Sequence, residues 1–533
     1  MTNSVNLHSA GHRRGVVCAP HAAAAETGLS ILAEGGNAIE AMLAMAASIA
    51  AVYPHMTHVG GDGFWLIREP SGRVRAIMAA GPTAAQAKPE LYRGHETMPT
   101  RGPLAALTVP GAVGGWILAH EAAKAHGGKL PLKDLLTPAI VQARRGYTVT
   151  RSQERLTREQ FDTLKDVPGF AARFLLDGKI PTLGAILKQE ALAATLEHLT
   201  HAGLDDFYRG DVGRETAADL ERIRSPLTRD DLQRYRARIA EPLRVELPSG
   251  TVFNTDAPTQ GVVSLMIVAL FARLGVKQAE SFDHIHGLVE ATKRGLHVRD
   301  RLVTDPNYLA HPLDRVLEEP SLAREAAMID RRKAAAWPLP AGKGDTIWMG
   351  AADTTGLVVS YIQSLYWEFG SGCVLPRTGL LMQNRGASFS LQPGALNYLT
   401  SGRLPFHTLN PALAVLKDGC VMAYGCMGGD GQPQTQSAVF TRYVDFRESL
   451  MEAIDRPRWV LGRTWGAPRT ALRLESRFDE ALIDALAAAG HDLDVLSEPY
   501  SDVMGHAGSV VLHPNGTCEG AHDPRADGGA AGL

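Results

Sequence analysis

The residues from Ala38 to Tyr53 are almost all apolar, and this run restricts the folds that the chain can adopt. A helix of this composition has no polar face to turn toward water, so most of its surface must be buried. The longest uninterrupted part, residues 41–53, is too short to cross about 30 Å of hydrocarbon. The run therefore predicts a helix enclosed by other layers of a globular protein rather than a membrane span.

The patterns on either side of this run predict a layered protein of helices and sheets. Helices are expected at residues 22–33, 117–125, 191–201, 261–274, 284–302, 436–455 and 479–489, and residues 112–332 are expected to be mostly helical. Strands are expected at residues 63–68, 73–78, 346–352, 357–363, 379–383, 413–416 and 420–425, with a last pair near residue 510. A basic, then Pro- and Gly-rich linker at residues 331–344 separates the helical part from the later strands.

Composition excludes several classes of partner. The chain has 54 basic and 57 acidic residues, a net charge of −3, which gives no electrostatic case for nucleic acid or an anionic membrane. The first residues lack the apolar core of a secretory signal. Five cysteines without a CxxC spacing predict neither a disulfide framework nor a zinc site. We expect a cytoplasmic protein.

Histidines offer little evidence for a metal. His55 and His58 lie beside a glycine loop, where bonds to the backbone are commoner than metal ligation. The pair His284 and His286 is expected in a surface turn that enters a helix. No nucleotide-binding or zinc-protease motif is present, so no metal and no organic cofactor are predicted.

Glycine is enriched, with 54 residues in 533 against a usual 7% or so. The sequence Gly-Gly-Asp-Gly occurs twice, at residues 60–63 and 428–431. Paired glycines let consecutive N–H groups point into a cavity, which is how an oxyanion hole is built. Two tight turns would explain the same residues, and the sequence by itself leaves both interpretations open.

Taken together and in order, the motifs resemble those of the γ-glutamyltranspeptidase-type N-terminal-nucleophile hydrolases. The similar segments are residues 21–41 with a Gly-Gly-Asn-Ala turn, Pro54-His55-Met56, Gly60–Phe64, Val109-Pro110-Gly111, Thr346 seven residues before Asp353, Phe369–Gly372, Gly428-Gly429 and Gly520–Arg525. Without this resemblance, Thr346 would be an ordinary strand start. The resemblance covers nearly the whole chain and implies an α+β fold, a four-layer αββα sandwich.

The resemblance also implies that the chain cuts itself between Asp345 and Thr346. The products are a large fragment, residues 1–345, and a small fragment, residues 346–533, which stay together as a heterodimer in one composite fold, with a dimer of heterodimers as a further option. The length alone would have suggested about three domains. Thr346 would then be the nucleophile, with its own α-amine as base. Ser364 would orient Thr346, and the N–H groups of Gly428 and Gly429 would bind the oxyanion.

The residues that would bind the glutamyl group depart from the family pattern. Met78 stands in the place of the carboxylate-binding Arg, and Ser388 in that of the amine-binding Asp. Tyr366 and Arg385 replace nearby amide side chains, and His407-Thr408 replaces a Ser-Ser pair. Residues 384–390 resemble instead the subgroup that includes oxamate amidohydrolase. We therefore predict a small carboxylate-bearing amide as substrate, bound by Arg385, with His407 and Thr408 shaping the pocket.

Three alternatives stay open at this stage. Arg385 could be a solvent-exposed loop cation. The protein could be a γ-glutamyltransferase or glutathione hydrolase with a rebuilt glutamate site. It could also be a ligand-binding relative that never matures.

Overall fold

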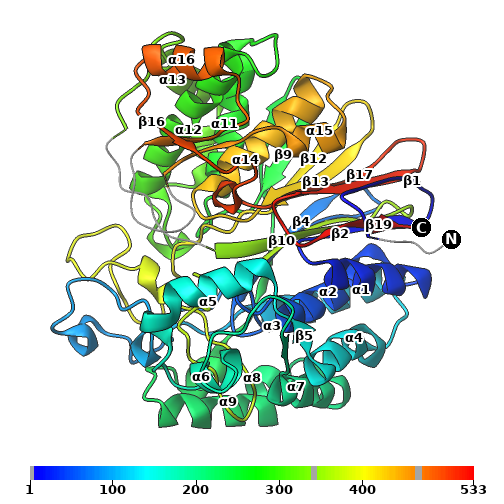
Figure 1. Cartoon of the computed structure of the whole chain (residues 1–533), viewed down its shortest axis with the longest axis vertical. Helices are drawn as coiled ribbons and strands as arrows, with labels where there is room; N and C mark the ends of the chain where they lie inside the picture. Colours follow the sequence, from blue (N-terminus) through cyan, green and yellow to red (C-terminus); the bar gives the residue numbers. More distant parts are fainter. Residues whose placement is uncertain (1–4, 338–344, 463–470) are drawn as a thin grey trace.

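Two antiparallel sheets lie face to face at the centre of the molecule, and helices cover both outer faces (Figure 1). The structure is a computed structural model that describes residues 5–337, 345–462 and 471–533. The first sheet has the order β19 (Gly529–Gly532), β2 (Gly15–Ala19), β10 (Asp345–Asp353), β11 (Val358–Tyr366), β3 (Asp62–Arg68), β4 (Val74–Ala79), β7 (Arg238–Ala240). The second has the order β1 (His8–His12), β18 (Cys518–His522), β17 (Ala507–Leu512), β13 (Val421–Cys426), β12 (Ala412–Leu416), β9 (Gly250–Asn254), β8 (Leu243–Leu247).

Strands from both sides of residue 345 alternate within each sheet. In the first sheet, β10 and β11 lie between β2 and β3, and in the second, β12, β13, β17 and β18 lie between β1 and β9. Later strands thus occupy the centre of both sheets between earlier strands, and one further late strand, β19, forms an edge of the first sheet. Neither sheet can form from one part of the chain alone.

The layer between the sheets is apolar and closely packed. It is lined by side chains such as Phe64, Ile362, Leu413 and Val510. Trp348 of β10 crosses this layer: an added Cβ at Gly425 of β13 would lie 2.1 Å from its ring, and one at Gly508 of β17 would lie 2.5 Å from it. Glycine at both positions makes room for the indole and fixes β10 against the second sheet.

The helices form two separate outer layers. Helices α1 (Ala22–Ala33), α2 (Ala38–Val52), α3 (Ala112–Ala125), α4 (Leu132–Arg145) and α7 (Glu190–Ala202) share a core with the first sheet. Helices α11 (Gly261–Leu274), α12 (Phe282–Leu302), α14 (Gly431–Phe440) and α16 (Glu480–Ala488) share a core with the second. Figure 1 shows the two groups on opposite sides of the strands. The predicted four-layer α+β sandwich is confirmed.

Helix α2 is formed by the apolar run that begins at Ala38. All of its residues are buried, including Glu40 in its first turn. Asn37 caps its N-terminus through a capping box with Glu40, whose carboxylate accepts the Asn37 N–H at 2.9 Å. A second carboxylate also caps this end: Asp353 Oδ2, at the end of β10, accepts the Ala38 N–H at 2.8 Å. Carboxylate and amide side chains rather than water therefore accept the free backbone N–H groups at this buried helix end.

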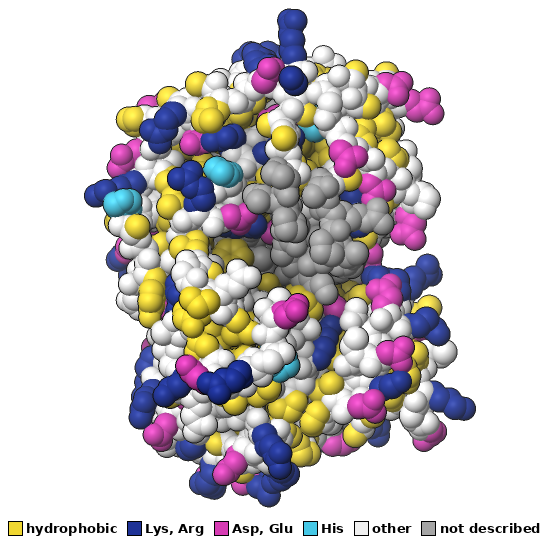
Figure 2. Space-filling model, turned by 90° about the vertical axis from the view of Figure 1, so that its left-hand side faces the viewer, with side chains coloured by type: hydrophobic (Ala, Val, Ile, Leu, Met, Phe, Trp, Pro, Cys, Tyr) yellow, Lys and Arg dark blue, Asp and Glu magenta, His cyan; other side chains and the backbone are white. Residues whose placement is uncertain are grey.

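Further elements complete the described chain. They are α5 (Arg151–Leu164), α6 (Phe170–Phe174), α8 (Asp206–Arg209), α9 (Asp211–Arg222), α10 (Arg229–Arg234), α13 (Glu319–Ala327) and α15 (Leu450–Asp455), with β5 (Tyr147–Thr148) paired to β6 (Ile186–Leu187), and β14 (Trp459–Leu461), β15 (Leu472–Glu475) and β16 (Leu493–Leu496) in a three-stranded sheet. Of the helices in the described ranges, none is long and apolar enough to span a bilayer. On the face in Figure 2, the described Lys and Arg side chains are interspersed with Asp and Glu rather than gathered by sign.

Residues 112–332 are mostly helical, as expected, but they also hold the hairpin β8–β9, which was not expected and which extends the second sheet. Two expectations about elements are wrong. Residues 379–383 form no strand, and a single bridge joins Leu381 to Val374. The helix expected at residues 436–455 is broken: α14 ends in a π-turn at Thr441–Asp445, and Ser449 caps the separate helix α15.

Candidate active site

Thr346 lies at the start of β10, buried in the middle of the first sheet. The register pairs Asp345 with Tyr366 and Ile347 with Gln363, so Thr346 alone lies opposite two residues, Ser364 and Leu365. This is a β-bulge in β11. Bulges redirect side chains and are frequent beside active sites, and this one places Ser364 across the strands from Thr346.

Gln432 is a neighbour of Thr346 that sequence reasoning missed. Its Nε2 donates to Thr346 Oγ1 at 3.3 Å. Gln432 belongs to the first turn of α14, in the helical layer over the second sheet. The one sequence signal for Gln432 was its place directly after the second Gly-Gly-Asp-Gly sequence. A residue that follows a tight turn lies close to the groups that the turn contacts.

The turn at Gly428 and Gly429 joins β13 to α14. Its φ angles are +115° at Gly428 and +44° at Gly429, in the left-handed region that favours glycine. The Gly428 carbonyl accepts the Gly431 N–H at 2.7 Å, whereas within the described ranges the N–H groups of Gly428 and Gly429 donate to no acceptor. The tight turn is confirmed, and its two N–H groups remain available for an oxyanion, which stays a prediction.

Two side chains from the first part of the chain hold this turn in place. Gln260 Nε2 donates to the carbonyls of Gly429 at 2.9 Å and Thr408 at 2.7 Å. Arg299 Nη1 donates to Gln260 Oε1 at 3.0 Å and to Asp430 Oδ1 at 2.5 Å. All of these side chains are buried, so the network is a rigid support for the glycine turn.

Ser364 lies where the bulge, the first glycine pair and Arg385 meet. Its Oγ accepts the Tyr366 N–H at 2.7 Å and lies 3.4 Å from Arg385 Nη2. An added Cβ at Gly61 would lie 2.2 Å from the Ser364 carbonyl oxygen. Glycine at residue 61 therefore permits a close backbone approach, and the Gly61 N–H already donates to His58, so it is not free for an oxyanion.

Arg385 is fully buried, so the alternative of an exposed loop cation is wrong. Its guanidinium carbon lies 4.1 Å from the centre of the Tyr366 ring. In the described structure, Nε and Nη1 have no hydrogen-bond partner, and Nη2 has only Ser364. Burial lowers the pKa of Arg385 to about 10, against the opposing influence of Tyr366 and Asp62, so the group stays charged at neutral pH. Such a cation lacks the carboxylate that normally accompanies a buried arginine.

His407 lies beside Asp62, the acidic residue of the first Gly-Gly-Asp-Gly sequence. Its Nε2 is 3.3 Å from Asp62 Oδ2, while Asp62 Oδ1 accepts the N–H groups of Gly81 at 3.2 Å and Gly111 at 2.9 Å. Burial, reinforced by the charge of Arg385, lowers the pKa of His407 to about 4 despite Asp62. The imidazole is therefore neutral at physiological pH.

The remaining predicted pocket residues are distributed unevenly. Ser388 shares a short turn with Arg385, and the buried hydroxyls of Ser388 and Thr408 have no hydrogen-bond partner among the described residues. Met78 lies on β4 between the sheets. With Phe64 it lines a cavity of about 310 Å³ whose lining does not include Arg385. Phe64 contacts the His407 ring at a centroid distance of 4.9 Å, and no described contact joins Met78 to Arg385.

His55 and His58, which were weighed as metal ligands, form hydrogen bonds with neighbouring protein groups. His58 Nδ1 accepts the Leu381 N–H at 3.1 Å, and its Nε2 lies 3.3 Å from Gln189. His55 Nε2 lies 3.1 Å from the hydroxyl of Ser152. The expectation of a surface turn at residues 284 and 286 is wrong: both histidines are buried, because residues 284–293 of α12 are buried on every side of the helix. Gly342 and Gly344, expected to make the approach to the cut flexible, lie outside the described residues.

Comparison with known proteins gives the family. The model of the γ-glutamyltranspeptidase family matches residues 24–533. The chain belongs to this family. It is therefore an enzyme, a hydrolase of the N-terminal-nucleophile type, as the order of motifs predicted.

Relatives of this family member match over their full length. An oxamate amidohydrolase proenzyme from Klebsiella pneumoniae is 49% identical, covering 99% of this chain and 100% of the relative. A glutathione hydrolase-like proenzyme from Bacillus subtilis is 36% identical, covering 97% and 98%. A cephalosporin acylase from Bacillus halodurans superposes with a TM-score of 0.89 at 29% identity, covering 99% of this chain and 97% of that one.

Proposed function

We propose that the protein is a self-cleaving amidohydrolase that hydrolyses a small carboxylate-bearing amide, oxamate or a close analogue, through an acyl-enzyme on Thr346. The buried guanidinium of Arg385 carries this proposal: it lacks a carboxylate partner and contacts Ser364, the cross-strand neighbour of Thr346. A substrate carboxylate supplies the missing partner. The 49% identity to a protein named oxamate amidohydrolase supports the same substrate class.

Maturation is the first chemical step. Thr346 Oγ attacks the carbonyl carbon of Asp345, the hydroxyl proton passes to the peptide nitrogen, and the C–N bond breaks, so the amide becomes an ester and the α-amine of Thr346 is released. Water then hydrolyses the ester, which frees the Asp345 carboxylate and the Thr346 hydroxyl. The two fragments remain associated because their strands alternate in both sheets.

Turnover uses the same hydroxyl with the new amine as base. With a reference pKa of about 7.7–8.0, the α-amine is partly neutral near pH 7 and accepts the hydroxyl proton. Thr346 Oγ attacks the substrate amide carbon, and the N–H groups of Gly428 and Gly429 stabilise the oxyanion. The protonated amine then donates to the leaving nitrogen, ammonia is released from a primary amide, and water hydrolyses the acyl-enzyme.

Substrate specificity follows from the charges in the pocket. The guanidinium of Arg385, whose Nε and Nη1 are unpartnered, donates hydrogen bonds to the substrate carboxylate. The hydroxyls of Ser388 and Thr408 and the neutral imidazole of His407 complete the polar wall. Met78 and Ser388 offer no charged anchor for a glutamyl group, so a γ-glutamyl compound binds weakly.

Substrate comparison tests this proposal directly. The purified enzyme is assayed with oxamate, by ammonia release, and with a γ-glutamyl anilide, by aniline release. We expect rapid hydrolysis of oxamate and slow hydrolysis of the anilide. Fast release from the anilide with none from oxamate would refute the substrate assignment and favour a glutathione hydrolase, the class that the 36% identical relative's name suggests.

A denaturing gel tests maturation separately. Cleavage after residue 345 splits the 57.2 kDa chain into fragments of about 37 and about 20 kDa, in proportion to 345 and 188 of 533 residues. The variant Thr346→Ala is expected to stay intact. A wild-type chain that also stays intact would instead indicate a ligand-binding relative that never matures.

A further inference from the structure

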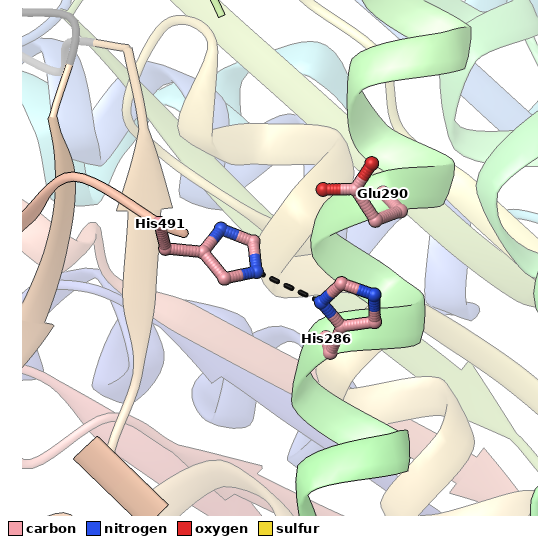
Figure 3. Close-up of side chains that lie close together, drawn as sticks. All are labelled: His286, Glu290 and His491. Carbon is pink, nitrogen blue, oxygen red and sulfur yellow. Dashed lines mark hydrogen bonds between the residues drawn. The ribbon is translucent and has the colours of Figure 1, made fainter. Parts of the chain in front are cut away.

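A second group of buried polar side chains lies in the helical layer over the second sheet. His286 and Glu290 are one turn apart on α12, and His491 follows α16 (Figure 3). The exposed fractions of their side chains are 1%, 2% and 7%. One ligand atom from each lies within 4.8 Å of the other two. None of these residues takes part in the chemistry assigned to Thr346.

The two imidazoles are already oriented toward each other. His286 Nε2 lies 2.8 Å from the Asp330 carbonyl oxygen, and because a carbonyl only accepts, this nitrogen carries the proton. His286 Nδ1 therefore accepts a hydrogen bond from His491 Nε2, 2.8 Å away, and Nε2 of His491 can bind an ion once that ring takes its other tautomer, with the proton on Nδ1. A carbonyl that fixes the tautomer of a histidine in this way is the usual support of a metal-bound imidazole.

The third group is a carboxylate that is held in place from the other side. Glu290 accepts the Ala335 N–H at 3.1 Å and a hydrogen bond from Lys293 Nζ at 2.7 Å. Lys293 also donates to the Ala335 carbonyl at 2.6 Å, so its ammonium holds the backbone at Ala335 against Glu290.

An ion can reach this group from outside. A cavity of about 670 Å³ is lined by His491, Lys293, Asp330 and Trp337 among others. In a tetrahedral zinc site with Zn–N distances of about 2.0–2.1 Å, two ligand nitrogens lie about 3.3 Å apart. The two ring nitrogens therefore need to separate by only about half an ångström, which a side-chain rotation on the cavity side supplies.

We propose that His286, Glu290 and His491 form a binding site for a divalent transition-metal ion, with Zn²⁺ as the best match. Two imidazoles and one carboxylate are a common zinc ligand set, which leaves a fourth position for water from the cavity. His286 and Glu290 precede residue 345, whereas His491 follows it. The ion thus links the two fragments of the proposed mature enzyme, and the site is a cross-link rather than a catalytic centre.

Zinc titration of the purified enzyme tests this site. The protein is freed of metal with a chelator, dialysed, and titrated with ZnCl₂ by calorimetry and with CoCl₂ by visible absorption. We expect one tight Zn²⁺ per chain, the visible bands of four-coordinate Co²⁺, and a rise in Tm with Zn²⁺. His491→Gln and the isosteric Glu290→Gln should each lower the affinity at least about tenfold and abolish the Tm shift.

His201→Gln is the matched control, because His201 is an exposed histidine in the last turn of α7. It should bind Zn²⁺ like the wild type. If His491→Gln fails to fold, Glu290→Gln and the wild-type titration still decide the question. A wild-type enzyme that takes up no Zn²⁺, or one whose affinity is the same in Glu290→Gln as in the control, overturns the proposal.

Discussion

Replacing Arg385 by methionine separates a substrate-binding arginine from a structural one. Methionine has a similar length and no charge, so it removes the guanidinium without leaving a large void. A buried arginine that pairs with a substrate carboxylate contributes about 2–5 kcal/mol, since removing it leaves the carboxylate buried and unpaired. We therefore expect kcat/KM for oxamate to fall by about 30- to 4000-fold.

The same substitution should have little effect on stability. In the free enzyme, the contacts of Arg385 in the described structure are one 3.4 Å hydrogen bond to Ser364 and the Tyr366 ring. The ring contact is worth about 2 kcal/mol when desolvated, while burying an arginine costs several kcal/mol. These terms nearly cancel, so we expect the free energy of unfolding in urea to change by less than about 1 kcal/mol.

Arg525→Met is the matched control. Arg525 is equally buried but fully paired, with Nε donating to Glu475 at 2.6 Å and Nη1 to Asp523 at 3.0 Å. Its loss should lower the free energy of unfolding by about 3–5 kcal/mol. The neutral diamide oxamide is a second control, because Arg385→Met should not slow its hydrolysis. An Arg385→Met enzyme that unfolds as readily as the Arg525 variant, or that keeps wild-type kcat/KM for oxamate, would refute the assignment.

Three further predictions concern the surroundings of Thr346. Gly428→Ala, at a φ of +115°, should strain the turn by about 1–3 kcal/mol and lower kcat by about 10²–10³, as measured with oxamate. Gln432→Leu removes the donor to the Thr346 hydroxyl, and should slow both turnover and self-cleavage by about 2- to 13-fold, as followed by ammonia release and on gels. Because the pKa of His407 is lowered to about 4, its neutral form favours folding at neutral pH, and this contribution is lost as pH falls from about 6.5 to 4. His407→Asn should flatten the acid loss of stability by up to about 1.4 kcal/mol per pH unit, and an unchanged slope in urea unfolding would contradict the buried neutral imidazole.

The elements that could be predicted from the sequence are those whose own residues show that the element must be buried. Helix α2 was predictable because a helix without a polar face must be buried in the protein interior, and α11 was predictable for the same reason. The hairpin β8–β9 was missed because strong helical periodicity on both sides of it dominated the interpretation of that segment. The helix at residues 436–455 was predicted too long because a π-turn leaves the apolar pattern intact while it changes the direction of the chain.

The site was predictable in part, and for a different reason. Thr346, Ser364 and the second glycine pair came from an ordered set of motifs, not from any local property of those residues. Gln432 carries no periodic or compositional signal, and neither do Gln260 and Arg299. Their roles depend on contacts between segments that lie far apart in the sequence; Gln260 and Arg299, for example, differ by 39 in residue number. The burial of Arg385 was likewise invisible, because an arginine in a loop is ordinarily exposed.

The supports of the active site cross the boundary between the two proposed fragments. Gln260 and Arg299, from the first part, hold the carbonyl of Gly429 and the carboxylate of Asp430 in the second. The close approach of Gly61 to Ser364 crosses the boundary in the other sheet. Because these contacts are buried and present in the uncut chain, the proposed cleavage would change one covalent bond without dismantling the surroundings of Thr346. The proposal therefore requires the uncut chain to fold first, since neither proposed fragment alone contains both the turn and the residues that hold it.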